Sequence, residues 1–247
     1  MDPMPARAAP ATPVAVIFDN DGLLLDTEEA WTRAEETLFA RRGRTFTMAD
    51  KRVLIGSSRE DAAARLELML DAPGTGLAIM DELHDLVMDE ALKPVHPRPG
   101  ALALVEALRV VGMPMAVASN SPRVFLDRVL EGAGLAGSDS PFLATIAGDE
   151  VARPKPAPDI YLAACAALGA DPAQCVAFED SPPGVAAARA AGIHVTGVPY
   201  FAGGELPGAD AIASILDDPR ILAMFGIIPE TCPPHLTVYS TSCRPSR

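Results

Sequence analysis

The amino-acid sequence predicts an α/β fold, in which a doubly wound, mostly parallel sheet carries an α-helical cap domain inserted after its first strand. Three observations favour this fold. Short apolar runs alternate with helical patterns over most of the chain, which is typical of βαβ units. Residues 26–97 break that alternation and read as one helix after another. The first three apolar runs each end in polar residues, as strands do at the ligand-binding edge of a parallel sheet.

The strands are predicted from four almost continuous apolar runs, at residues 14–18, 114–118, 175–178 and 193–198. Runs of this length fit parallel strands that helices cover on both faces. The crossover helices are predicted from patterns with helical spacing, at residues 101–111, 123–130, 159–169 and 184–192. Strands and helices that alternate in this way build a doubly wound sheet.

The cap is predicted from the helical segment that follows the first strand. Two patterns of the capping-box type, Thr47 to Asp50 and Ser58 to Asp61, predict helix starts within it. A proline-rich segment at residues 93–100 returns the chain to the sheet. Both ends of the chain are predicted to be disordered tails. The predicted boundaries are 14–25 and 96–228 for the core, 26–95 for the cap, and 1–13 and 229–247 for the tails.

Composition narrows the class of protein. The 247 residues are 49 % hydrophobic and 21 % charged, which is typical of a soluble globular protein. A net charge of −13 offers no basic surface for nucleic acid. No stretch is apolar enough for a secretory signal or a membrane span, so we expect a cytoplasmic protein without a membrane partner. We also expect a monomer or a weak homo-oligomer.

Lysine is rare, and its positions are therefore informative. The chain has 17 arginines but only three lysines, Lys51, Lys93 and Lys155. Where such a chain uses lysine, we expect a specific demand for an ammonium group. Lys155 lies in the segment PKPAPDIY, where prolines and a following helix start favour a fixed position for its side chain.

Polar clusters follow the first, second and third apolar runs: Asp19-Asn20-Asp21, Ser119-Asn120-Ser121 and Glu179-Asp180-Ser181. The Ser-Pro pairs at 121–122 and 181–182 are typical of an N-cap followed by the first helical residue. The carboxyl edge of the sheet thus combines carboxylates with helix N-termini, which favour anions. Carboxylates that lie this close need a cation or a retained proton, and hard oxygen ligands favour Mg²⁺. Phosphate fits both the metal and the helix ends.

The motifs, taken together, resemble the haloacid dehalogenase-like superfamily. DxDGxLxDT matches Asp19 to Thr27, the second motif matches Ser119, KPxPD matches Lys155, and EDSxxG matches Glu179 to Gly184. Their order agrees with the family, and they cover about residues 14–200. Within the superfamily the chain is similar to the β-phosphoglucomutase and sugar-phosphatase group, which has a small helical cap on a Rossmann-like core.

The resemblance implies roles for the residues of the motifs. Asp19 would be the nucleophile that forms an aspartyl-phosphate, and Asp21 the general acid and then base. Ser119 and Lys155 would hold the transferring phosphoryl group, and Asn120 would assist them through its side chain or backbone.

A metal site is also implied. Mg²⁺ would be bound by the Asp19 carboxylate, the Asp21 backbone carbonyl and Asp180, with Glu179 bound directly or through water. Because alternate residues of an extended strand point to opposite sides, Asn20 is predicted to point away from Asp19 and Asp21.

The cap residues separate a phosphatase from a mutase. Arg59 matches the arginine that, in sugar-phosphate mutases of the family, contacts a distal phosphate. Trp31 stands where those mutases carry a histidine, and an indole cannot handle protons as imidazole does. We therefore expect a phosphatase that acts on a small phosphorylated metabolite, a sugar or nucleoside monophosphate. The alternatives are a phosphomutase and a non-catalytic phosphometabolite-binding protein.

Overall fold

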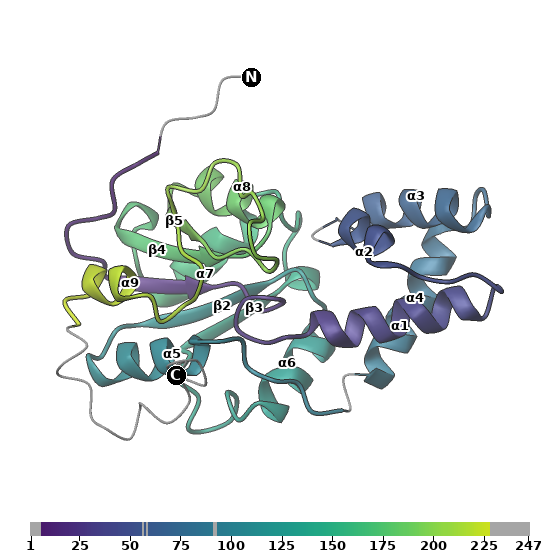
Figure 1. Cartoon of the computed structure of the whole chain (residues 1–247). Helices are drawn as coiled ribbons and strands as arrows, with labels where there is room; N and C mark the ends of the chain where they lie inside the picture. Colours follow the sequence, from purple (N-terminus) through teal and green to yellow (C-terminus); the bar gives the residue numbers. More distant parts are fainter. Residues whose placement is uncertain (1–5, 56, 58, 91–92, 228–247) are drawn as a thin grey trace, which may run out of the picture.

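A six-stranded sheet, with neighbouring strands parallel throughout, lies at the centre of the computed structural model, which describes residues 6–55, 57, 59–90 and 93–227 (Figure 1). Its strand order is β3-β2-β1-β4-β5-β6, so the first strand is central and the chain winds outward in both directions. The strands are β1 (Ala15–Phe18), β2 (Met115–Ser119), β3 (Ala144–Ala147), β4 (Cys175–Glu179), β5 (His194–Gly197) and β6 (Ala211–Ile212). The predicted fold class, a doubly wound α/β sheet, is confirmed.

Alternation along the buried strands supplies two apolar faces. Val16 and Phe18 of β1 belong to the cluster that α5 and α6 cover, while Ala15 and Ile17 belong to the cluster that α7 and α8 cover. β1 is fully buried because helices cover both faces and β2 and β4 flank it on either side. The helices of the core are α5 (Ala101–Val110), α6 (Arg123–Gly132), α7 (Asp159–Leu168), α8 (Pro182–Ala190) and α9 (Pro219–Met224), with single 3₁₀ turns at Gly148–Glu150 and Pro172–Gln174.

Four helices follow β1 and lie beyond the carboxyl end of that strand (Figure 1). They are α1 (Glu28–Ala40), α2 (Met48–Leu54), α3 (Arg59–Leu70) and α4 (Gly76–Glu90), and α4 packs against both α1 and α3. The capping box predicted at Thr47 and Asp50 is present at the start of α2. The one predicted at Ser58 lies outside the described residues. The predicted cap boundaries, 26–95, bracket these four helices.

Three helices and strands were not predicted from the sequence, and each is short or only partly buried. The edge strand β3 is largely half-buried, β6 has only two residues, both exposed, and α9 has six residues. Part of the predicted N-terminal tail also differs from the prediction, because the backbone N–H and the guanidinium of Arg7 both donate to Asp210 beside β6.

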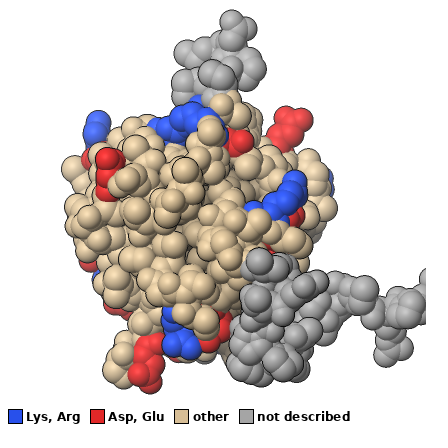
Figure 2. Space-filling view, turned by 90° about the vertical axis from the view of Figure 1, so that its left-hand side faces the viewer, with Lys and Arg blue, Asp and Glu red and all other residues tan. Residues whose placement is uncertain are grey.

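The charge distribution is mixed at the end of the core opposite the cap. Figure 2 shows that face, where charged side chains of both signs are scattered among uncharged ones. Across the part of the chain that the structure describes, every helix is too short or too polar to cross a bilayer.

Candidate active site

Lys155 joins two carboxylates that come from neighbouring strands. Its Nζ donates to Oδ1 of Asp19, just after β1, at 2.5 Å, and to Oε1 of Glu179, at the end of β4, at 2.7 Å. The side chains of all three residues are at least 92 % buried. Burial favours the neutral amine, but Asp19 and Glu179 outweigh it and raise the pKa of Lys155. The two carboxylates therefore favour the charged ammonium and hold it in place.

Tyr161 completes this arrangement, and its place there is not predicted from the sequence. Its hydroxyl donates to the same Oε1 of Glu179 at 2.6 Å, and Nζ of Lys155 lies 5.1 Å from its ring centroid. Burial and the neighbouring carboxylates raise the pKa of Tyr161, so the phenol stays a donor. The available signal was its place six residues after Lys155, in the first turn of α7.

Asn120 fixes the backbone of Lys155. Its side-chain carbonyl accepts from the Lys155 N–H at 2.8 Å, and its amide donates to the Lys155 carbonyl at 3.1 Å. Both polar groups of the side chain are thereby engaged. An assisting contact from Asn120 to phosphate would come from its backbone.

Asp21 lies among four donors. Its Oδ2 accepts from the hydroxyls of Ser119 at 2.5 Å and Ser121 at 2.9 Å. Its Oδ1 accepts from Thr27, the residue before α1, at 2.8 Å. The carboxylate of Asp21 thus connects the second strand to the first linker of the cap.

Two expectations about these neighbours are wrong. Ser121 does not cap α6, because the helix begins at Arg123 and its N-cap position is Pro122; the Ser121 hydroxyl donates to Asp21 instead. Asn20 does not point away from Asp21, since its amide lies 3.2 Å from Oδ1 of that residue. Asn20 is fully buried, and its own side-chain oxygen has no hydrogen-bond partner among the described residues. The N-cap predicted at Ser181 is present, because its hydroxyl accepts from Gly184 N–H.

Three carboxylates, Asp19, Glu179 and Asp180, bring one oxygen each within 4.8 Å of the others. Burial, and then the mutual repulsion that Lys155 only partly offsets, raises the pKa of Asp19 well above its ordinary value. The pKa of Asp180 is raised well above its own for the same two reasons. Three carboxylates around one ammonium leave negative charge uncompensated, and the donor set is oxygen only. The cluster therefore fits a hard divalent cation.

Two glycines allow the carboxylates to approach the backbone. Gly22 has φ +80°, and a Cβ there would overlap Oδ2 of Asp180. A Cβ on Gly184 would overlap the carboxylate of Glu179. These positions of the first and fourth motifs therefore require glycine.

A pocket of about 470 Å³ lies between the carboxyl edge of the sheet and the cap helices. Its volume is within the range of small-molecule sites, about 300–1,000 Å³. From the core it is lined by Asp19, Asp21, Asn120, Lys155 and Asp180, and from the cap by Glu28, Trp31, Glu35, Lys51, Arg52, Arg59 and His84, among others.

The two predicted cap residues reach this pocket but have protein partners. Arg59 forms an ion pair with Asp81 on α4 at 2.5 Å, and its side chain is 44 % exposed. Trp31 packs across to Phe125 of α6, with 6.2 Å between ring centroids. Contact of either residue with substrate stays a prediction. His84 also lines the pocket.

The fold is thus a Rossmann-like α/β core whose carboxyl edge presents a buried aspartate–lysine pair beneath an inserted helical cap. The haloacid dehalogenase-like hydrolase family matches residues 14–192, and the chain belongs to that family.

The chain is also similar to named relatives and to solved structures. The chain is 34 % identical to protein CbbY of Rhodobacter capsulatus over 207 residues, which cover 79 % of this chain and 90 % of that protein. It is 32 % identical to validoxylamine A 7'-phosphate phosphatase of Streptomyces hygroscopicus subsp. limoneus, over 83 % of this chain and 94 % of that one. A mutant CbbY from Rhodobacter sphaeroides, solved with xylulose-(1,5)bisphosphate, has a TM-score of 0.72 at 27 % identity, over 87 % of this chain and 99 % of that one. The family and its phosphatases support the predicted enzyme class, a phosphoric monoester hydrolase.

Proposed function

We propose that this protein is a Mg²⁺-dependent phosphatase that hydrolyses a small phosphomonoester, a sugar or nucleoside monophosphate, through an aspartyl-phosphate at Asp19. The observation that carries the proposal is the buried contact of Lys155 with Asp19 on the floor of the pocket. A fixed ammonium beside a buried carboxylate neutralises the charge of an incoming phosphoryl group. The relatives named for a phosphorylated substrate or solved with one support the same chemistry.

The reaction follows from the placement of the side chains. Asp19 attacks phosphorus, the bond to the ester oxygen breaks, and Asp21 gives a proton to the leaving alcohol. Water then attacks the aspartyl-phosphate, Asp21 takes its proton, and phosphate leaves. Ser119, whose hydroxyl now contacts Asp21, is expected to turn to a phosphoryl oxygen when substrate is bound.

The metal would be held by the Asp19 and Asp180 carboxylates and the Asp21 carbonyl. Glu179 already accepts from Lys155 and Tyr161, so we assign it a contact through water and a positioning role for Lys155. Bound Mg²⁺ supplies positive charge that stabilises the phosphoryl oxygens.

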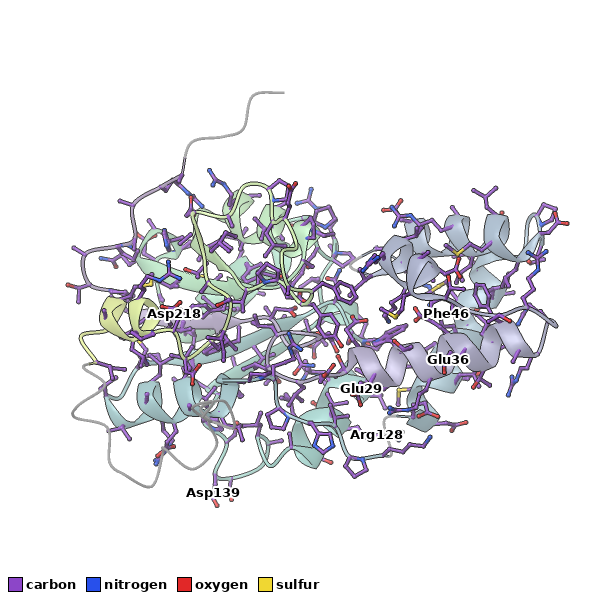
Figure 3. All side chains as sticks on the ribbon, viewed as in Figure 1. Glu29, Glu36, Phe46, Arg128, Asp139 and Asp218 are labelled. Atoms are coloured by element: carbon purple, nitrogen blue, oxygen red, sulfur yellow. The ribbon has the colours of Figure 1, made fainter. Side chains whose placement is uncertain are left out.

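A phosphate-release screen across small phosphomonoesters tests the proposal. We expect turnover that requires Mg²⁺, stops with EDTA and is lost in Asp19→Asn. Asp139→Asn, an exposed aspartate outside the pocket, is the matched control and should retain activity (Figure 3). The absence of turnover for every ester, or turnover that survives both EDTA and Asp19→Asn, would contradict the proposal.

One observation favours the second candidate, a phosphomutase. Arg59 and His84, an anion ligand and a proton carrier, both line the cap side of the pocket. A mutase conserves organic phosphate, whereas a phosphatase releases it. Product analysis with a hexose monophosphate and catalytic bisphosphate therefore separates the two.

A further inference from the structure

A second buried polar cluster lines the pocket on its cap side. Lys51 of α2 lies against α1, with its Nζ 2.6 Å from Oε2 of Glu28 and 3.0 Å from Oε2 of Glu35. The side chains of Lys51, Glu28 and Glu35 are only 3 %, 12 % and 5 % exposed. We call these three residues the cap triad. It accounts for one of the three lysines in the chain.

The cap triad has unused hydrogen-bonding capacity. An ammonium offers three N–H donors, and Glu28 and Glu35 take two of them. Within the described part of the chain, no third acceptor contacts Lys51, and no donor contacts Oε1 of Glu35. Since both side chains line the pocket, a bound molecule can supply the partners.

Charge and geometry limit what that molecule presents. Two carboxylates and one ammonium have no net positive charge, whether or not Glu35 keeps its proton, so they do not attract an anionic group. An apolar group would leave the donor and the acceptor unpaired. A hydroxyl group fits both, because it donates to the free oxygen of Glu35 and accepts from the free N–H of Lys51.

The cap triad is also connected to the reacting carboxylates. Glu28 directly follows Thr27, whose hydroxyl donates to Asp21. A substrate whose phosphate lies at Asp19 and whose carbon chain extends toward the cap therefore meets the triad inside the same pocket.

We propose that the cap triad binds the hydroxyl groups of the substrate, so that the enzyme selects a phosphorylated polyol or sugar over an ester whose far end is apolar. Glu35 and Lys51 are the specificity-determining residues. This inference rests on the proposed phosphatase function, and it narrows the substrate class of that site.

The test compares sorbitol 6-phosphate, which has hydroxyl groups along its chain, with phenyl phosphate, which has none. The isosteric variant Glu35→Gln and the variant Lys51→Met are assayed with both esters, and their thermal unfolding is recorded. Glu36→Gln is the matched control, because Glu36 is the next residue of α1 and is exposed (Figure 3).

We expect the ratio of kcat/KM for sorbitol 6-phosphate to that for phenyl phosphate to fall at least about tenfold in both variants, mainly through KM, since each loses a hydrogen bond to a charged group. Glu36→Gln should keep the wild-type ratio. A ratio unchanged in Glu35→Gln, with the fold intact, overturns the inference while leaving phosphatase activity standing. Failure of the wild-type protein to hydrolyse any ester overturns the proposed function itself.

Discussion

Asn120 holds Lys155 by its backbone, with one hydrogen bond of 2.8 Å to the Lys155 N–H and one of 3.1 Å from the asparagine amide to the Lys155 carbonyl. Asn120 follows β2, while Lys155 lies in the loop before α7. Asn120, at the end of a strand, therefore holds the loop residue Lys155 in position. In the proposed mechanism the ammonium meets a phosphoryl group, so we expect this backbone contact to affect the chemistry through the position of Lys155.

Asn120→Ala is expected to lower kcat about 10- to 100-fold, because a small displacement of a charged group in an active site has effects of that size. KM should change less, since the ammonium remains in the pocket. Steady-state kinetics with the best ester from the screen measures both constants. Gln174→Ala, which removes an exposed amide, is the control. A kcat within twofold of wild type would show that Lys155 keeps its position without Asn120.

Asn20→Leu is expected to keep turnover within about threefold of wild type. The side-chain oxygen of Asn20 is buried without a partner, and its only described side-chain hydrogen bond is a 3.2 Å contact with Asp21, which keeps three other donors. Removal of an unpaired buried acceptor should also leave the melting temperature equal or higher. Asp21→Asn, in contrast, should lose activity about 1,000-fold. A loss in Asn20→Leu as large as that would assign the amide a direct role.

The sequence predicts the strand ends well because parallel strands bring their carboxyl ends to one edge. Asp19, Ser119 and Asp180 needed only the apolar runs before them to be placed there. The contacts between side chains could not be predicted from the sequence. The hydroxyls of Ser119 and Ser121 reach Asp21, and Tyr161 reaches Glu179, only because the helices and loops pack as they do.

The contacts within the cap could not be predicted from the sequence either. The rarity of lysine predicts that the ammonium group of Lys51 has a specific role. The partners of that ammonium depend on how α2 lies against α1. Glu28 and Glu35, seven residues apart, are brought to one ammonium by two turns of α1. Strands β3 and β6 were not predicted because they lie at or near the ends of the strand order, where a strand can be short and partly exposed.

Glu35 makes the stability of the protein depend on pH. Burial, offset in part by Lys51, raises the pKa of Glu35 from 4.5 to about 7. An acid with a raised pKa binds its proton more tightly in the folded state, so the free energy of unfolding falls as pH rises from 4.5 to about 7. The contribution is at most about 3 kcal/mol over that window.

Urea unfolding of wild type and Glu35→Gln across this pH range measures the effect. The variant has no proton to lose there, so its stability should decline less steeply, whatever its level at acid pH. Glu36→Gln should follow the wild-type curve. Parallel curves for Glu35→Gln and wild type would mean that the carboxyl of Glu35 titrates normally.

Mg²⁺ is expected to raise the melting temperature, because a cation that binds only the folded protein adds about 2.7 kcal/mol at 100 times its Kd. The repulsion among Asp19, Glu179 and Asp180 supplies the driving force. Since the pKa values of Asp19 and Asp180 are raised, protons compete with the metal at acid pH, and the shift in melting temperature should grow as pH rises. Asp180→Asn should melt at the same temperature with and without Mg²⁺, whereas Asp139→Asn should respond as wild type does. An equal response in Asp180→Asn would place the metal away from this cluster, whether or not the enzyme turned out to need it for activity.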